Sequence, residues 1–357
     1  IFSSTKELVS VLKDLPIADT LNIELTGGEC TLFADQIYDF YQEMKKIERV
    51  KDTKINIGIV TNGTQLEKLF PLFDEGIIDP WSTKISWDGI YSESKSRKSK
   101  TGLTDEYFND KIKTLGASKY NKDVLVRIAL TKDTIDDLAD SFEYALNAGC
   151  NKIEYYLLYL KDDPNYYADP EFLEKIRKQL FKIGLLYMDH PFDYENWNYL
   201  FYTDMIEDKS KLFDLSCEIL GRMLYITIDG DIYPCSMFHN FFSDTEIFKL
   251  GNVHEGLHKD AIWKFTEEYK RFSQFDLCKS SSCGNYHCYK CPAFLYYRQT
   301  EDGIYGRYDF CRLRSIEKTV FNHYAPLVVC DEEKIQKRMD FTKYGSLTYD
   351  LPNCFRM

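Results

Sequence analysis

The sequence contains no long hydrophobic segment. Its longest run of apolar and aromatic residues, at 155–160, is far shorter than the roughly 20 residues that a membrane-spanning helix needs. The first residues also contain no cationic stretch leading into an apolar one, which is the pattern of a secretory signal. We therefore expect a cytoplasmic protein without a membrane partner.

Positive charge is in the minority. The chain has 45 Lys and Arg residues against 57 Asp and Glu residues, which gives a net charge of −12. An acidic surface repels phosphate-rich polymers, so we do not expect nucleic acid as a partner. Low-complexity segments are also lacking. With 44% hydrophobic and 29% charged residues, the 357-residue chain is typical of a globular protein with about two domains.

Cysteine, in contrast, is plentiful and unevenly distributed. The chain has 11 cysteines. Seven of them lie close together in the C-terminal half: Cys217, Cys235, Cys278, Cys283, Cys288, Cys291 and Cys311. In a reducing compartment such a group indicates a metal site rather than a disulfide framework, because thiolates bind soft metals tightly.

The first 185 or so residues alternate short strand-like runs with longer helical patterns. Runs rich in β-branched and aromatic residues predict buried parallel strands at Leu21–Leu25, Ile55–Val60, Thr83–Trp87, Val124–Leu130 and Lys152–Leu158. Amphipathic segments between them predict helices at Asp35–Glu48, Thr104–Leu115 and Thr134–Asn147. Consecutive βα units form a parallel sheet or barrel, whose ligands lie at the C-terminal ends of the strands.

Short polar motifs follow the first three predicted strands. They are Thr-Gly-Gly-Glu at 26–29, Thr-Asn-Gly at 61–63 and Ser-Trp-Asp-Gly at 86–89. Consecutive glycines let a ligand approach the backbone closely, and the carboxylate of Glu29 beside them can pair with an amine. The fourth strand carries Arg127 within an apolar run, and a charge in that position requires an anionic partner.

The pattern changes beyond about residue 186, where an aromatic-rich connection leads into the cysteine-rich region. We predict two domains, residues 1–200 and 201–357. Within the second domain, Asp229-Gly230 separates the strand-like runs Met223–Ile228 and Ile232–Pro234 and predicts a β-hairpin.

Taken in order, these motifs resemble those of the radical S-adenosylmethionine enzymes that carry a C-terminal SPASM domain. The segment at 26–29 resembles the family's Gly-Gly-Glu motif. Cys217, twelve residues, Gly230, four residues and Cys235 resemble the opening of the SPASM signature. The resemblance implies an α/β fold, with a partial (β/α)6 TIM-like barrel followed by a cysteine-rich domain that has a β-hairpin and iron–sulfur clusters.

The same resemblance implies that seven residues bind S-adenosylmethionine: Gly27, Gly28, Glu29, Asn62, Ser86, Asp88 and Arg127. The Gly-Gly-Glu motif would hold the amino group of the methionine moiety, and Arg127 would meet its carboxylate. Taken singly, each polar residue has a structural alternative. Glu29 could be a helix N-terminal acid, Arg127 could form an ion pair, and the other three could form turns.

By resemblance, the cysteines would bind two auxiliary four-iron four-sulfur clusters. One set of ligands would be Cys278, Cys283, Cys288 and Cys311. The other would be Cys217, Cys235 and Cys291, with a fourth iron that is open to a substrate group or closed by Cys330, Cys354 or His239. An alternative is a structural zinc bound by Cys278, Cys283, Cys288 and Cys291, although zinc leaves the other three grouped cysteines without a role.

Three features depart from the family pattern. The Cys-x3-Cys-x2-Cys segment that binds a third cluster is not present, and we expect it upstream of Ile1 together with the first barrel strand. Cys30 stands where the family usually has Pro. The spacing of the later cysteines also differs, with four residues between Cys278 and Cys283 and two between Cys288 and Cys291.

The resemblance implies an enzyme that generates a 5′-deoxyadenosyl radical and oxidatively modifies a ribosomally made peptide, with thioether crosslinking at Cys as the leading prediction. Such an enzyme acts on a precursor peptide or protein and receives electrons from a donor such as flavodoxin or ferredoxin. One alternative is the anaerobic sulfatase-maturating, formylglycine-forming type, although Ser236 stands where those enzymes have an acid that serves as a base. The other is a non-catalytic, cluster-bearing scaffold or peptide-binding protein.

Overall fold

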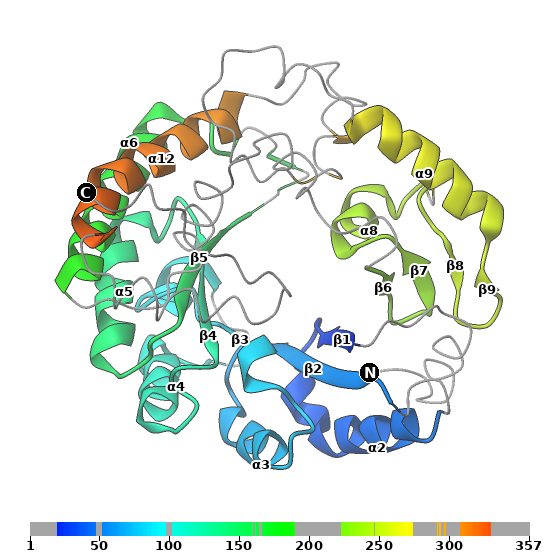
Figure 1. Ribbon diagram of the computed structural model, residues 1–357. Coiled ribbons are helices and arrows are strands. Elements are labelled where there is room, and N and C mark those ends of the chain that lie inside the picture. Colours follow the sequence, from blue (N-terminus) through cyan, green and yellow to red (C-terminus); the bar gives the residue numbers. More distant parts are fainter. Residues whose placement is uncertain are drawn as a thin grey trace.

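The computed structural model describes residues 20–47, 52–97, 102–158, 160, 162–163, 166–189, 223–245, 247–273, 291, 293, 296–297 and 308–329. Within these residues the chain forms two sheets with their helices (Figure 1). Among the described helices, none has the length and apolar character needed to cross a membrane. The predicted domain boundary near residue 200 lies outside the described residues.

Five parallel strands form the first sheet, in the order in which they occur in the sequence. They are β1 (Thr20–Leu25), β2 (Lys54–Thr61), β3 (Lys84–Ser86), β4 (Leu125–Leu130) and β5 (Ile153–Leu157). The predicted α/β fold with a partial barrel is thereby confirmed, and each predicted strand is found within one or two residues of its expected ends.

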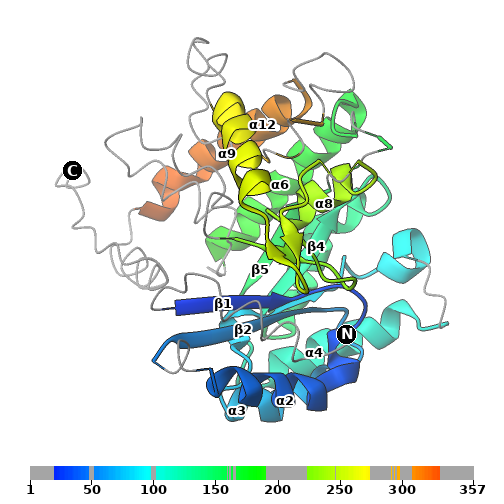
Figure 2. The ribbon, with the colours of Figure 1, turned by 90° about the vertical axis from the view of Figure 1, so that its right-hand side faces the viewer.

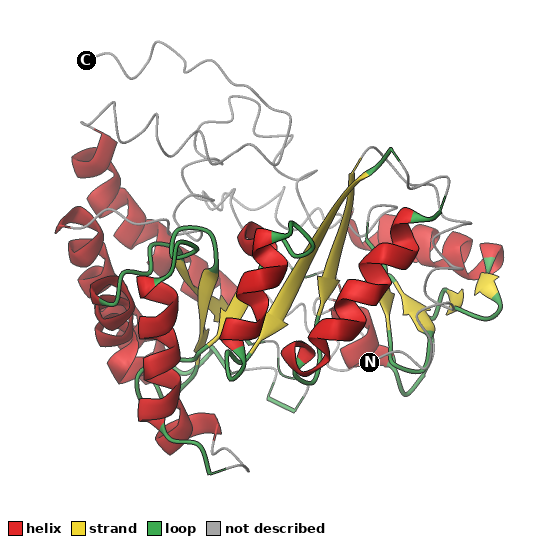
Figure 3. Ribbon diagram, turned by 90° about the horizontal axis from the view of Figure 1, so that it is seen from below, coloured by secondary structure: helices red, strands yellow, loops and turns green. Residues whose placement is uncertain are grey.

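Helices cover the outer side of this curved sheet (Figures 1 and 3). They are α2 (Ala34–Lys45), α3 (Leu69–Asp74), α4 (Asp105–Ala117), α5 (Leu138–Asn147) and α6 (Pro170–Asp189). Short helical turns complete the connections: η1 (Cys30–Phe33), η3 (Leu66–Lys68), η4 (Pro80–Ser82), η5 (Glu93–Arg97) and η6 (Ile135–Asp137). Thr104 caps α4, because its hydroxyl accepts a hydrogen bond from the Tyr107 N–H at 3.3 Å.

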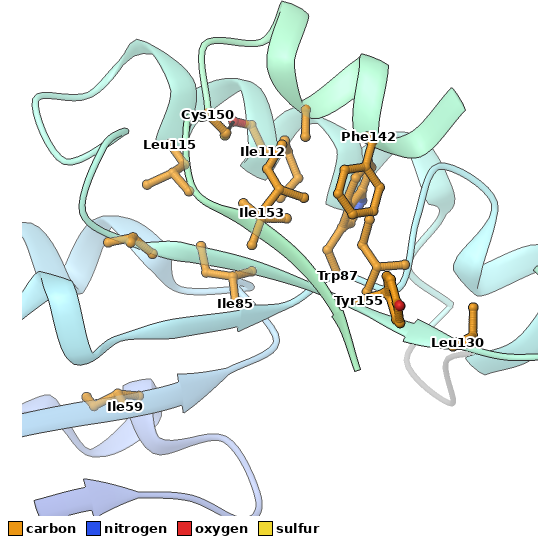
Figure 4. Packing of buried hydrophobic residues seen from close by; sticks show 14 of the residues in the cluster. Ile59, Ile85, Trp87, Ile112, Leu115, Leu130, Phe142, Cys150, Ile153 and Tyr155 are labelled. Atoms are coloured by element: carbon orange, nitrogen blue, oxygen red, sulfur yellow. Dashed lines mark hydrogen bonds between the residues drawn. The ribbon is translucent and has the colours of Figure 1, made fainter. Parts of the chain in front are cut away.

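Alternate residues of each strand point to opposite faces of the sheet, and the outer face is apolar. Ile57 and Ile59 are completely buried there. Figure 4 shows how Ile153 of β5 packs with Ile112 of α4 and Phe142 of α5. Burying each such side chain contributes about 1.5–3 kcal/mol, so this apolar layer holds the helices on the sheet.

The inner face carries polar side chains that pair between strands. The Asn56 side chain donates to Asn22 Oδ1 at 2.9 Å. Lys84 forms an ion pair with Glu24, whose side chain is 46% exposed. Among the described residues, the inner face of this sheet therefore carries polar side chains, and Glu24 and Lys84 remain partly exposed.

The second sheet is antiparallel and contains β6 (Tyr225–Ile226), β7 (Asp231–Tyr233), β8 (Gly251–Asn252) and β9 (Gly256–Leu257). The predicted hairpin is confirmed, since β6 and β7 pair across a turn in which Gly230 has a φ of +82°. Helices α8 (Ser236–Phe242) and α9 (Lys259–Ser273) accompany this sheet (Figure 2). Its separate core includes Phe238, Phe242, Phe248 and Phe265.

The last described helix, α12 (Tyr308–Val329), packs against α6 of the barrel (Figure 1). Gly184 of α6 makes this close approach possible, because a Cβ atom there would lie 2.2 Å from the ring of Tyr324. A buried hydrogen bond between Tyr155 of β5 and Glu317 of α12 adds a polar link. Helix α12 therefore belongs to the apolar core of the first sheet.

Candidate active site

A tight turn of two glycines follows β1. Gly27 and Gly28 have φ angles of +88° and +57°, which side chains with a Cβ atom adopt only with strain. A Cβ atom at either position would meet no other atom within 4 Å. The backbone of this turn is therefore open to an approaching ligand, as the motif predicts.

The Glu29 carboxylate joins this turn to the end of β2. Its Oε1 accepts hydrogen bonds from the Thr31 N–H at 3.1 Å, the Thr31 hydroxyl at 2.6 Å and the Thr61 hydroxyl at 2.6 Å. Its Oε2 accepts from the Asn62 N–H at 2.8 Å. Glu29 is thus the N-cap residue of η1, as the structural alternative predicted, and at the same time links two strand ends.

All four of these donors are neutral. Within the described residues no Lys or Arg side chain pairs with Glu29, so its negative charge has no cationic partner there. A carboxylate offers about four lone-pair sites, and Oε2 is engaged by a single donor. The carboxylate is therefore held in a fixed orientation and can still accept an ammonium group.

Asn62 forms a turn with its side chain. Its Oδ1 accepts a hydrogen bond from the Thr64 N–H at 2.9 Å, while its own N–H is bound to Glu29. Gly63 continues the turn with a φ of +81°. The structure thus brings Asn62 to Glu29 through its backbone.

Asp88 has a backbone conformation that is uncommon for a residue other than glycine, with a φ of +64°. Its side chain is buried, and both oxygens are engaged within the protein. Oδ1 accepts from the Ala129 N–H at 2.9 Å, and Oδ2 lies 3.2 Å from Arg97 Nε. Burial raises the pKa of the Asp88 carboxyl, against the opposing effects of Arg97 and of the Ala129 N–H.

Ser86, Arg127 and Glu154 are neighbours in the register of β3, β4 and β5. Arg127 forms an ion pair with Glu154, which is the structural alternative considered for Arg127, and its guanidinium lies 5.4 Å from the Tyr156 ring centroid. Burial, together with the negative charge of Asp88, raises the pKa of Tyr156 to about 12. The Arg127 side chain remains 25% exposed, so a ligand carboxylate can still reach it.

Three further residues of this edge of the sheet, including Thr61 of the Thr-Asn-Gly motif, were not predicted as site residues. The Thr61 hydroxyl donates to the Glu29 carboxylate, and Glu154 forms an ion pair with Arg127. Arg97 donates to the Ser86 carbonyl at 2.7 Å and also pairs with Asp88. A charge inside the apolar run of β5 is a signal that could have indicated Glu154. No such sequence signal marks Arg97, because only the position of η5 in the fold brings its side chain to Ser86 and Asp88 at the end of β3.

The predicted cluster ligands are described only in part. Cys217, Cys278, Cys283 and Cys288 lie outside the described residues, and for Cys311 the structure describes the backbone position in α12 alone. Cys235 is a buried member of the second core, and Cys291 packs against the same core. Among the described residues, no three His, Cys, Asp or Glu side chains converge to bind a single metal ion.

Two other cysteines are buried thiols. Burial raises the pKa of Cys30 to about 11 and that of Cys150 to about 12. The Cys150 thiol lies 3.6 Å from the Ile112 carbonyl, to which it donates. Raised pKa values keep both thiols protonated at neutral pH, so they are poor nucleophiles.

Residues 217–292 match the family model of SPASM, an iron–sulfur cluster-binding domain. No curated protein matches the sequence. Among solved structures, the chain is similar to native anSMEcpe with bound AdoMet, at 16% identity and a TM-score of 0.67, over 94% of this chain and 90% of that chain. It is also similar to native anSMEcpe with bound AdoMet and Cp18Cys peptide, at 15% identity and a TM-score of 0.63, over the same shares of the two chains.

AdoMet is S-adenosylmethionine, and anSMEcpe is an anaerobic sulfatase-maturating enzyme. These likenesses confirm, for the fold and for the cysteine-rich domain, the resemblance that the motifs indicate.

Proposed function

We propose that this chain, which has a SPASM domain and the fold of a radical S-adenosylmethionine enzyme, belongs to a protein that oxidises a side chain of a peptide or protein substrate. The observation that carries the proposal is the Glu29 carboxylate, fixed by neutral donors beside an open glycine turn. This is the arrangement that an amino acid's ammonium group requires.

The residues at this edge of the sheet fit the methionine part of AdoMet. Glu29 would accept the ammonium group, the Gly27-Gly28 turn would let the backbone approach it, and Arg127 would meet the carboxylate. Asp88 would act differently from our prediction of direct contact. Since both of its oxygens are engaged by Ala129 and Arg97, it would keep the turn after β3 in place.

When bound, AdoMet and the clusters supply a hydrogen-abstracting radical and a path for single electrons. The chain's own part is to orient the substrate and exclude water. The polar inner face of the barrel, with the Lys84–Glu24 pair, provides hydrogen-bonding groups where a peptide backbone would lie. Cys235 and Cys291, on one core of the SPASM domain, fit a shared cluster.

The test is anaerobic incubation of the full-length protein with AdoMet, a reductant and a candidate cysteine-containing precursor peptide, followed by mass spectrometry. We expect formation of 5′-deoxyadenosine and of an oxidised peptide. Thioether crosslinking removes two hydrogens and retains the cysteine sulfur. An unchanged peptide and no AdoMet cleavage, with every candidate substrate, would contradict the proposal.

Formylglycine formation is a second candidate, because the chain shares its fold with a sulfatase-maturating enzyme over most of its length. Against it stands Ser236, whose hydroxyl is a poor base. The two reactions differ in the fate of sulfur. Conversion of a cysteine to formylglycine removes its sulfur, so the same mass spectrum distinguishes them.

A further inference from the structure

We propose that Arg97 is a positioning residue of the candidate AdoMet site, which holds the end of β3 in the shape that the ligand requires. The inference rests on the proposed function and deepens it, because it identifies a side chain outside the sheet on which AdoMet binding depends.

Strand pairing alone holds the end of β3 weakly. The strand has three residues, and Ser86, the last of them, has a register partner in β4 but none in β2. Two positions later, Asp88 has a φ of +64°, a conformation that a residue other than glycine keeps only when its surroundings impose it. The ligand edge of β3 therefore needs contacts from outside the strand.

Arg97 supplies two of these contacts from one guanidinium. Its Nη1 donates to the Ser86 carbonyl at 2.7 Å, and its Nε lies 3.2 Å from Asp88 Oδ2. The other oxygen of Asp88 accepts a hydrogen bond from the Ala129 N–H of β4 at 2.9 Å. A chain of polar contacts thus runs from Arg97 through Asp88 to β4, beside the place where Ser86 lies opposite Arg127 in the register.

The turn that carries Arg97 is anchored at two points. The Glu93 N–H donates to Asp105 Oδ1, in the first turn of α4, at 2.7 Å. Lys95 forms an ion pair with Asp137 of η6. Because η5 is held at these points, the Arg97 side chain reaches the end of β3 from a fixed backbone.

Arg97 also balances a buried charge. The Asp88 side chain is 9% exposed, and burial raises its pKa while the positive charge of Arg97 opposes that rise. Tyr156 of β5 faces both charges, but its pKa of about 12 keeps it neutral near pH 7, and Arg127 is paired with Glu154. With Arg97 removed, Asp88 would take up a proton or turn toward solvent, and the end of β3 would lose its support.

The experiment compares variants of the full-length protein, with its iron–sulfur clusters, by calorimetry with AdoMet. Arg97→Ala should bind AdoMet roughly tenfold more weakly than the parent, which is the loss expected for hydrogen bonds to a charged group. Arg97→Lys should recover part of the affinity, because an ammonium group can pair with Asp88 but lacks the planar fork that also reaches Ser86. Asp88→Asn in the Arg97→Ala background should recover part as well, because it removes the unpaired charge.

Two readouts separate positioning from a general loss of stability. The ratio of parental to Arg97→Ala affinity should decrease as the pH is lowered, because protonation of Asp88 removes the charge that Arg97 balances. In the protein without AdoMet, Arg97→Ala should speed hydrogen exchange of the Ala129 N–H and leave exchange in α12 unchanged.

The matched control is Arg177→Ala. Arg177 lies on α6, is 44% exposed and pairs with Glu174, so AdoMet affinity and exchange at Ala129 should keep their parental values. Equal AdoMet affinity in the parent and Arg97→Ala would overturn the positioning role and leave the proposed function intact. If Arg97→Ala does not fold, Arg97→Lys decides: weaker AdoMet binding by a stable protein supports the inference, and parental affinity overturns it. A parent that binds no AdoMet would overturn the proposed function as well.

Discussion

At the scale of single residues, Glu29 connects the two strand ends that form the candidate AdoMet site. Glu29→Gln replaces one acceptor oxygen by an NH2 group, which cannot accept a hydrogen bond. Either the Asn62 N–H or the three donors at Oε1 then lose their acceptor. We expect a loss of about 1–3 kcal/mol in the free energy of unfolding, measured by urea denaturation.

The same substitution should weaken AdoMet binding by roughly 2 kcal/mol or more, measured by calorimetry on the full-length protein, because the charge facing an ammonium group is removed. Glu43→Gln is the matched control. Glu43 is an exposed residue of α2 that pairs with Lys46, and such surface pairs contribute little. Equal AdoMet affinity in the parent and Glu29→Gln would place the ammonium site elsewhere.

Asp88 should give the protein a pH-dependent component of stability. Because burial raises its pKa in the folded state, the folded protein binds this proton more tightly than the unfolded chain does. The stabilisation is therefore present at low pH and is lost as the pH rises from the ordinary value of 3.8 through the raised folded-state pKa.

Asp88→Asn keeps an acceptor for the Ala129 N–H, and Asn tolerates a positive φ. Relative to the parent, this variant should therefore gain in free energy of unfolding as the pH rises across that range, measured by denaturation at a series of pH values. Asp39→Asn, on the exposed side of α2, corrects for the removal of one negative charge. A stability difference that stays constant with pH would show that Asp88 is not linked to folding in this way.

At the scale of the elements, the contact between α6 and α12 depends on Gly184. Gly184→Ala would ordinarily stabilise a helix by about 1 kcal/mol. Here the added Cβ would lie 2.2 Å from the buried Tyr324 ring, and overpacking of this kind costs about 1–3 kcal/mol. We expect a net decrease in the free energy of unfolding, together with faster hydrogen exchange in α12.

Leu185→Ala serves as the control, because Leu185 is the next residue of α6 and is 58% exposed. That variant should leave exchange in α12 unchanged. An increase in stability on Gly184→Ala would mean that the two helices are less closely packed than the structure shows.

The helices of the barrel could be predicted because apolar residues recur along them with the helical period, and the strands because runs of β-branched and aromatic residues are buried almost continuously. The Gly27-Gly28 turn could be predicted as well, because its positive φ angles favour glycine, and Glu29 could be predicted because its carboxylate lies directly beside that turn. The pairing of Arg127 with Glu154 depends on the register of two strands, and the packing of α12 on α6 joins distant parts of the chain. Neither leaves a periodic signal in the sequence.

At the scale of the whole molecule, the cysteine-rich region should bind two clusters. We expect the anaerobically reconstituted chain to contain about eight irons with matching acid-labile sulfide, because seven grouped thiolates suit two cubane clusters better than one zinc. Cys288→Ala should lose about half of this iron, since a cluster short of a thiolate ligand is no longer held. Metal analysis that finds one zinc and no sulfide would contradict the assignment.

Cys150→Ala is the control for iron content. Its buried thiol donates to the Ile112 carbonyl within the core of the barrel and should not contribute to either cluster. A decrease in iron equal to that of Cys288→Ala would indicate that the loss reflects general unfolding.

The packing of α12 on the barrel makes the SPASM region an insertion in the chain rather than an appendage. Tyr155 and Glu317, which join β5 to α12, are 162 positions apart in the sequence. Closing so large a loop costs conformational entropy before its contacts can repay it, and contacts of such high order form slowly. Helix α12 can therefore dock on the barrel only after the intervening cysteine-rich region has been synthesised. Folding of the barrel is then completed after synthesis of that region.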